Sequence, residues 1–315
     1  MGNALRRNTN SIRDEYNGRR RPACLGQDPP TTPTSFDRKF IIVGRSKNGE
    51  MKYPLPANAE EKKLWLEDPH YLIRHQWQSN FSSPVEEILK KGANVIDIGC
   101  GTGTWSLEMA KNYPESNFIG VDIAPIFPTK HHEENLKFTL GNILEGLPFE
   151  DNTFDLVFAR LVGESFSEKE WEETVLRELF RLTKSGSWLE IMQTDSEFSR
   201  CGKNLEKMNQ AFVAINMNSS ICEKFEDWLL NNNQVSVVNH EIAISPIGTW
   251  AGKTGEFGVS YIRHLSLKMK QQIINHLNIT EEEYDNMVEM AELEYNQFTT
   301  FRTSHRFIAQ KKIIF

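Results

Sequence analysis

Short apolar runs and longer amphipathic stretches alternate along the middle of the chain. Strands are predicted at the apolar runs, which span residues 94–99, 117–123, 136–142, 154–161 and 187–195. Helices are predicted between several of them, at residues 104–114 and 167–186. Strands that are separated by helices of about 10 to 20 residues pair in parallel through right-handed crossovers. The pattern therefore predicts an α/β fold built on a mostly parallel sheet.

The helix predicted over 167–186 carries signals at both of its ends. Ser167 and Glu170 have the spacing of a capping box, and Gly186 is expected to end the helix. Its buried face is predicted to consist of Trp171, Val175, Leu179 and Leu182. A second capping pattern at residues 83–86, with proline at the first helical position, predicts another helix start.

Composition and periodicity divide the chain into four regions. Residues 1–35 are polar and rich in arginine, which predicts a disordered basic tail. Residues 36–92 predict an N-terminal helical segment, because apolar residues recur there at three- and four-residue steps. Residues 93–195 form the core of alternating strands and helices. Residues 196–315 are predicted to add a helical insertion and the final strands of the same domain.

The final region carries two further strand-like runs, at residues 235–245 and 298–312. Helical periodicity precedes them over 203–231 and separates them over 247–296. Both runs join the sheet only if the helices between them form an insertion. We expect this insertion and the N-terminal helices to act as a lid over the substrate.

Charge and cysteine usage exclude several classes of protein. The net charge of −7 argues against a nucleic-acid partner, and no apolar run approaches the ~20 residues that span a membrane. Four widely spaced cysteines, with no C-x-x-C pair, argue against a disulfide framework and against a zinc site. They are typical of a reducing compartment, so the expected location is cytoplasmic or nuclear.

The stretch VIDIGCGTGTW places Gly99, Gly101 and Gly103 between the first strand and its helix. Glycine adopts positive φ and lets backbone N–H groups approach a ligand without an intervening Cβ. The following helix adds a partial positive charge at its start. In a parallel sheet this turn borders the crevice at the carboxyl ends of the strands, so it is predicted to bind a ligand.

Three further residues narrow the identity of that ligand. Asp122 ends the second strand, where a carboxylate can accept hydrogen bonds from both hydroxyls of an adenosine ribose. Thr104 stands where a dinucleotide-binding G-x-G-x-x-G pattern has glycine, and Asp97 would repel a pyrophosphate. Asp97 instead suits a cationic ligand that carries an amino group. An NAD-type Rossmann oxidoreductase therefore stays an alternative that both residues oppose.

The stretch VIDIGCGTGTWSLEMAKNYPESNFIGVDIAP resembles motif I and the acidic loop of class I S-adenosylmethionine-dependent methyltransferases. LEGLPFEDNTFDLVFARL resembles their fourth-strand region, and LFRLTKSGSWLEI their turn from helix to fifth strand. The flanking YPLPANAEEKKLW and GTWAGKTGE are similar to sequences in fungal, LaeA-like methyltransferases. The resemblance implies a Rossmann-like sheet of seven strands in the order 3-2-1-4-5-7-6, with the seventh strand antiparallel and helices on both faces.

The resemblance also implies S-adenosyl-L-methionine as cofactor and assigns residues to it. The loop around its methionine part would consist of Asp97, Gly99, Gly101 and Gly103. Asp122 would bind the ribose, and Ile123 would pack on the adenine. Asn142 and Ile143 match the end of the third strand, where the family often has an aspartate for the adenine amino group. Asn142 departs from that pattern, but its amide oxygen can accept the same hydrogen bond.

Candidate residues for the chemistry follow the fourth and fifth predicted strands. Arg160 is predicted to bind the cofactor carboxylate or a substrate anion, and Glu164 and Asp195 lie at the same rim. No residue stands out as the catalytic base. No metal site is predicted, because the His131–His132 pair lacks a third ligand nearby.

These observations predict a methyltransferase that acts on a small molecule or a protein. FARLVGES lacks the N-P-P-Y type of motif found in enzymes that methylate amino groups of bases, which again disfavours nucleic acid. A second reading is a cofactor-binding regulatory protein of secondary metabolism with little catalysis, and a protein partner stays open.

Overall fold

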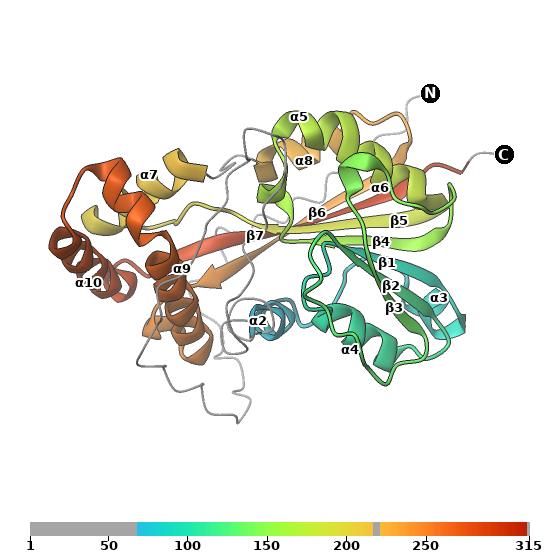
Figure 1. The fold of residues 1–315 in the computed structure, drawn as a ribbon, viewed down its shortest axis with the longest axis horizontal. Coiled ribbons are helices and arrows are strands. Elements are labelled where there is room, and N and C mark those ends of the chain that lie inside the picture. Colours follow the sequence, from blue (N-terminus) through green and yellow to red (C-terminus); the bar gives the residue numbers. More distant parts are fainter. Residues whose placement is uncertain (1–67, 217–220, 314–315) are drawn as a thin grey trace.

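The computed structural model describes residues 68–216 and 221–313. The predicted basic tail and the first part of the N-terminal segment lie outside the described residues. Within them, seven strands form one sheet with the order β3-β2-β1-β4-β5-β7-β6 (Figure 1). The strands are β1 (Asn94–Ile98), β2 (Asn117–Asp122), β3 (Leu136–Leu140), β4 (Phe154–Arg160), β5 (Thr183–Thr194), β6 (Val235–Pro246) and β7 (Phe301–Lys311).

Strands β1 to β5 pair in parallel, and β7 runs antiparallel to both of its neighbours, β5 and β6. This confirms the predicted strand order and the predicted direction of the last strand. Both late strands belong to the sheet, so the helices between them form an insertion as expected.

Helices cover both faces of the sheet, as predicted (Figure 1). In the view of Figure 1, α3 and α4 lie below the sheet, and α5, α6 and α8 lie above it. The helices are α2 (Asp68–Trp77), α3 (Glu86–Lys91), α4 (Thr104–Asn112), α5 (Glu168–Glu170), α6 (Leu176–Leu182), α7 (Lys203–Asn216), α8 (Ile221–Leu230), α9 (Lys253–Leu277) and α10 (Glu281–Gln297).

Alternation along β1 builds the core on both faces. Val95 packs in the cluster formed with α3 and α4, whereas Ile96 and Ile98 pack in the cluster formed with α6 and α8. Trp105 of α4 stacks on Phe158 of β4 with ring centroids 4.0 Å apart. Because both faces are covered, Val95, Ile96 and Ile98 are all buried, and apolar residues do not alternate with polar ones as in a half-exposed strand.

The helix predicted over 167–186 begins with the expected capping box of Ser167 and Glu170. It continues through a π-helical turn, η4 (Trp171–Val175), into α6. Its predicted end at Gly186 is wrong, because the helix stops at Leu182 and Thr183 already belongs to β5. Gly186 lies inside β5 instead, where the pairing with β4 shifts register and the glycine has φ +79°.

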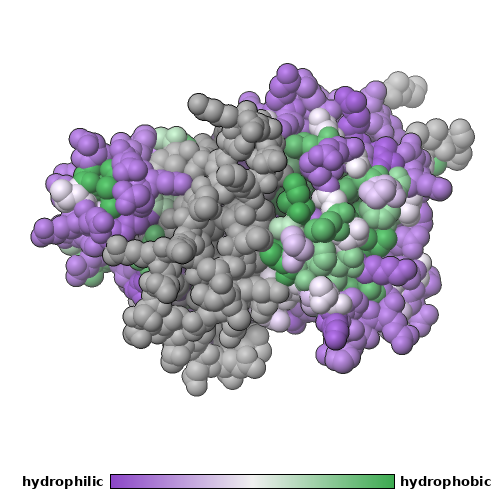
Figure 2. Space-filling view, viewed as in Figure 1, coloured by the Kyte–Doolittle hydropathy of each residue, from purple (hydrophilic) through white to green (hydrophobic). Residues whose placement is uncertain are grey.

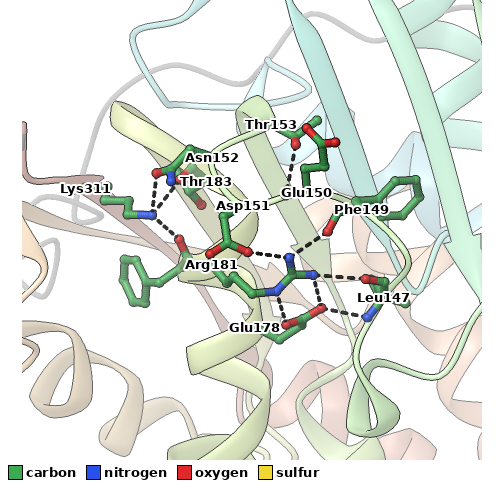
Figure 3. A network of polar contacts seen from close by, with 11 residues as sticks. Leu147, Phe149, Glu150, Asp151, Asn152, Thr153, Glu178, Arg181, Thr183 and Lys311 are labelled. Carbon is green, nitrogen blue, oxygen red and sulfur yellow. Dashed lines mark hydrogen bonds and ion pairs between the residues drawn. The ribbon is translucent and has the colours of Figure 1, made fainter.

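Contacts from distant parts of the chain fix this helix end (Figure 3). The buried ammonium group of Lys311 on β7 donates to the carbonyl oxygens of Phe180 (2.6 Å) and Thr183 (2.8 Å). These carbonyls have no partner within the helix, and a cation at a helix C-terminus is favourable. Arg181 pairs with Glu178 at 2.7 Å and donates to the carbonyl oxygen of Phe149 at 2.6 Å. A single strand far along the chain therefore overrides the local glycine signal.

The predicted helix start at residues 83–86 is partly wrong. Helix α3 begins at Glu86, but Ser83 makes no capping bond to it. The Ser83 hydroxyl donates instead to the carboxylate of Glu190 on β5 at 2.7 Å, and the backbone N–H of Ser83 donates to it at 2.8 Å. The buried carboxylate competes successfully for both donors, because it needs several hydrogen bonds in the interior.

Glu190 and Arg306 form a charge pair that is fully buried between β5, β7 and residues 79–83. Nε of Arg306 lies 3.7 Å from the carboxylate of Glu190. The Arg306 guanidinium also donates to the hydroxyls of Ser79 (2.7 Å) and Ser82 (2.9 Å). Burial raises the pKa of Glu190 and lowers that of Arg306, and the charge of each group opposes the shift of the other. The pair anchors the segment that follows α2.

A third hydrophobic cluster lies beyond the sheet, in the helical lobe formed by α7, α9 and α10 (Figure 1). Large members of this core include Phe212, Tyr284 and Tyr295. The predicted insertion supplies α9 and α10, but α7 comes from before β6, so the lobe is larger than 247–296. On the face seen in Figure 2, hydrophobic residues gather over the sheet, whereas the lobe is mostly hydrophilic. Among the described helices, none is both long and apolar enough to cross a membrane.

Candidate functional site

The turn of residues 99–103 joins β1 to α4, and we call it the glycine loop. Its three glycines have positive φ values of 70°, 56° and 73° at Gly99, Gly101 and Gly103. A Cβ on Gly99 would lie 2.3 Å from the Val162 side chain, and one on Gly103 would lie 2.3 Å from the Phe138 ring. A Cβ on Gly101 would meet no atom within 4 Å. Packing therefore explains two of the glycines, and Gly101 alone faces open space.

Asp122, at the end of β2, fixes the glycine loop by accepting hydrogen bonds from backbone N–H groups. Its Oδ2 accepts the backbone N–H of Gly101 at 2.8 Å, and its Oδ1 accepts that of Ala124 at 2.9 Å. The side chain is only 5% exposed, and burial raises its pKa. The backbone N–H of Ile123 also acts on this carboxylate, whose two oxygens have about four acceptor positions in all. Asp122 thus shapes the loop as well as offering acceptors to a ligand.

Asp97, the residue before the last in β1, is the second buried acid of the site. It is 4% exposed, and its Oδ2 accepts a hydrogen bond of 2.6 Å from the Ser106 hydroxyl on α4. Burial raises the pKa of Asp97 to about 6, against the lowering effects of Ser106 and Arg160. A buried carboxylate with this pKa favours the approach of a cation, because a positive charge nearby restores the ionised form.

Arg160, at the end of β4, reaches α2 through a histidine. Its Nη2 lies 3.1 Å from Nδ1 of His70, and Nε2 of His70 lies 2.6 Å from the Glu108 carboxylate on α4. Arginine only donates, so Nδ1 of His70 must carry the lone pair and Nε2 the hydrogen. A neutral histidine of that tautomer satisfies both neighbours. Burial and the Arg160 charge lower the pKa of His70 to about 4, consistent with the neutral form.

The chain Arg160–His70–Glu108 was missed by reading the sequence. Arg74 of α2 strengthens it with an ion pair to Glu108 at 2.8 Å. Burial lowers the pKa of Arg160 to about 10, while the charges of Asp97 and Glu108 oppose that shift. The guanidinium therefore lies in the field of Asp97, and α2 fixes its direction. No local signal marks His70, because its partners are far away in the sequence.

The end of β3 is built differently from the expectation. The Asn142 amide oxygen accepts the backbone N–H of Leu144 at 3.1 Å, and its amide nitrogen donates to Glu145 at 2.8 Å. Asn142 thereby caps the short 3₁₀ helix η2 (Ile143–Glu145). Ile143 is buried in the main core, and Ile123 is half-buried just past β2. A ligand contact for these three residues stays a prediction.

A family comparison decides what this arrangement belongs to. The family described as "Methyltransferase domain" matches residues 89–310, which include β1 to β6 and all of β7 except its last residue. The chain belongs to the methyltransferase-domain family. This confirms the resemblance seen in the sequence.

Similar methyltransferase-domain proteins come from fungi. The chain is 27% identical over 179 residues to the secondary metabolism regulator laeA of Coprinopsis cinerea, covering 54% of this chain and 43% of that protein. It is 30% identical over 128 residues to methyltransferase str2 of Strobilurus tenacellus, covering 41% and 44%. The chain thus spans less than half of the length of these two relatives.

Among solved structures, one similar protein is phosphoethanolamine N-methyltransferase 2 of Haemonchus contortus, whose structure holds S-adenosyl-L-methionine. The sequence identity is 17% and the TM-score is 0.44, with 83% of this chain and 62% of that chain covered.

In this methyltransferase-domain chain, the predicted site residues form two groups. Asp97, Gly101 and Asp122 converge at the carboxyl ends of β1 and β2, with Arg160 beside them on β4. Glu164 and Asp195 belong to a different place. Glu164 accepts a hydrogen bond of 2.6 Å from Ser196, and Asp195 lies 3.2 Å from His305 of β7.

Proposed function

We propose that the chain is an S-adenosyl-L-methionine-dependent methyltransferase that binds its cofactor over the glycine loop. The observation that carries the proposal is the pair of buried acids, Asp97 and Asp122, at the strand ends next to the glycine loop, where Gly101 faces open space. Membership of the methyltransferase-domain family supports it. When bound, the cofactor supplies an electrophilic methyl group on a sulfonium.

The residues of the site match the charges of that cofactor. Asp97 would pair with the ammonium of the methionine part, and its carboxylate is held in position by the Ser106 hydroxyl. The Arg160 guanidinium, directed by His70, offers donors to the carboxylate of the same part. Asp122 offers its remaining lone pairs to the ribose hydroxyls. Opposite charges at both ends of an amino-acid moiety distinguish this ligand from a pyrophosphate.

A small molecule is the acceptor that the observations favour. The net charge of −7 opposes a nucleic-acid acceptor. The lobe helix α9 contacts both α2 and β6, and the Ser245 hydroxyl of β6 donates to Gln76 of α2 at 2.9 Å. Helix α2 and the lobe thus meet on one side of the sheet, where a lid over the acceptor would lie. A cytoplasmic or nuclear location belongs to the same proposal.

The relatives support a second candidate function. Several of them are named secondary metabolism regulators, including those of Coprinopsis cinerea and Aspergillus niger. This chain could likewise bind the cofactor in a regulatory role with little catalysis and with a protein partner. The NAD-type oxidoreductase loses its support, because the chain belongs to the methyltransferase-domain family and Asp97 would repel a pyrophosphate.

Calorimetric titration with S-adenosylhomocysteine and with NADH tests the proposal. We expect the first to bind and the second to give no heat. Asp122→Ala should weaken binding by about 2–4 kcal/mol, or ~30- to 1,000-fold, because charge-assisted hydrogen bonds are lost. Asp227→Ala, at an exposed position of α8, is the matched control. Unchanged affinity in Asp122→Ala, or binding of NADH alone, would contradict the proposal.

A methylation screen then separates the two candidate functions. Metabolite extracts incubated with labelled cofactor should yield a labelled product if the protein is an enzyme. Cofactor binding without any labelled product or labelled protein would favour the regulatory role.

A further inference from the structure

Three side chains of types that can ligate metals lie close together next to the carboxyl end of β5. Asp195 follows β5, Cys222 lies in the first turn of α8, and His305 lies on β7. One ligand atom from each lies within 4.8 Å of the other two. We propose that these residues bind one divalent transition-metal ion of the zinc class. The cysteine spacing predicted no zinc site, but the three ligands come from separate elements and leave no local pattern.

A chain of hydrogen bonds sets the hydrogen positions at this site. The Glu226 carboxylate lies 2.9 Å from Nδ1 of His240, and Nε2 of His240 lies 2.9 Å from Nδ1 of His305. An ionised carboxylate only accepts, so Nδ1 of His240 carries a hydrogen. Nε2 of a neutral His240 then accepts the N–H at Nδ1 of His305. A neutral His305 is left with a bare lone pair on Nε2.

That lone pair faces another acceptor. Nε2 of His305 lies 3.2 Å from Oδ2 of Asp195, and it is buried without a hydrogen-bond partner. Three contacts link Glu226, His240, His305 and Asp195 in a row, and each hydrogen bond needs one N–H group. Two neutral imidazoles supply only two N–H groups, which are used by the first two contacts. The contact between His305 and Asp195 is therefore left without a hydrogen. Two facing lone pairs repel each other unless a metal ion, or a second proton on His305, lies between them.

The ligand types select the zinc class of cation. A thiolate, an imidazole nitrogen and a carboxylate oxygen are the ligands of Zn²⁺, whereas Mg²⁺ and Ca²⁺ prefer oxygen alone. A metal-bound histidine usually donates its other N–H to an outer partner, and His305 donates to His240, which Glu226 holds in turn. Three protein ligands leave the fourth tetrahedral position open for water.

The charges around the site are mixed but favour a cation. Arg302 opposes it, since its Nε donates to the backbone oxygen of Asp195 at 2.6 Å. Asp195 belongs to the site, and Glu226 lies behind it, next to His240. The negative charge of Glu164 also acts on the Cys222 thiol. The Cys222 thiol would lose its proton to the solvent when the metal binds, which adds another negative charge.

Cobalt titration of the metal-stripped protein tests the site. We expect one Co²⁺ per chain, with a thiolate-to-cobalt absorption band, and competition by Zn²⁺. Cys222→Ser and His305→Gln should each weaken binding by more than ~100-fold and remove or alter the band, whereas Cys201→Ser serves as the matched control and should keep it. Glu226→Gln should weaken binding by roughly 10- to 100-fold, as expected for an outer partner. Thermal melting of each variant verifies that it is folded.

Two results would overturn the metal site. Absence of stoichiometric cobalt binding would mean that an extra proton fills the contact between His305 and Asp195. Binding that survives Cys222→Ser unchanged would place the metal elsewhere. The titration needs no methyl donor, and S-adenosylhomocysteine binding is measured separately. Failure of the metal site and failure of the proposed function are therefore distinguishable.

Discussion

The two halves of the sheet, on either side of β4, hold their buried polar groups together over very different sequence distances. In the β1–β3 half, Ser106 binds Asp97 across 9 positions, and Gly101 binds Asp122 across 21. In the β5–β7 half, His240 contacts His305 across 65 positions, and Arg306 reaches Ser79 across 227. The polar contacts quoted for the first half join residues close in the sequence, whereas those of the second half form only after distant segments meet. Local patterns in the sequence can therefore describe the first half far better than the second.

The largest expected effect concerns the long-range half. Arg306→Ala leaves the Glu190 carboxylate buried without its counter-charge and removes the donors to Ser79 and Ser82. We expect a loss of about 3–5 kcal/mol in the free energy of unfolding, measured by chemical denaturation. The double variant Glu190→Gln/Arg306→Met should recover part of that loss, because it removes both charges. A loss below about 1 kcal/mol in Arg306→Ala would show that this half does not depend on the pair.

A pair of glycine variants tests the local half. Gly103→Ala combines a left-handed backbone with a clash against the Phe138 ring, so we expect a loss of about 2–4 kcal/mol in stability. Gly101→Ala meets no atom, and only the backbone strain of about 1–2 kcal/mol should appear. Its added methyl group would occupy the space assigned to the cofactor. Affinity for S-adenosylhomocysteine should therefore fall in a variant that stays folded.

The outcome that would contradict this division is specific. Equal stability losses in both variants would contradict the clash at Gly103, and an unchanged affinity in Gly101→Ala would mean that the ligand does not use the open position.

The smallest expected effect is a pH dependence of cofactor binding. Burial raises the pKa of Asp97 to about 6, so the free protein takes up a proton there as the pH falls below that value. A cationic ammonium pairs only with the ionised form, and binding must displace this proton. The dissociation constant of S-adenosylhomocysteine should rise by up to ~10-fold per pH unit below about pH 6 and stay level above pH 7. Titration calorimetry between pH 5 and 8 measures this, and Asp97→Asn should flatten the profile.

Reading the sequence captured the features that depend on short range. The alternation of apolar runs and helices predicted a mostly parallel sheet, and the family resemblance implied the strand order that the structure has. The structure does bring Asp97, Gly101 and Asp122 together at neighbouring strand ends. Their contact with a cofactor stays a prediction, and so do the roles of Asn142, Ile143 and Ile123.

The features that were missed depend on partners from distant strands and helices. The helix end predicted at Gly186 is wrong because the Lys311 ammonium of β7 donates to carbonyl oxygens at the actual end of the helix, four residues earlier. His70 gave no signal, since it acquires its role only between Arg160 and Glu108. Cys222 and His305 each stand alone in the sequence, and only the pairing of β7 with β5 places His305 beside Asp195.

From the place of β7 between β5 and β6 we expect a definite order of folding events. Leu189 of β5 pairs with Ala309, and Val238 of β6 pairs with the same residue from the other side. Until β7 is inserted, β5 and β6 each present an unpaired edge, which is the kind of surface that invites aggregation. Contacts this far apart in the chain form slowly, because a large loop must close first. The glycine loop can therefore form in a nascent chain before the site at Asp195, which is complete only after β7 has paired with β5.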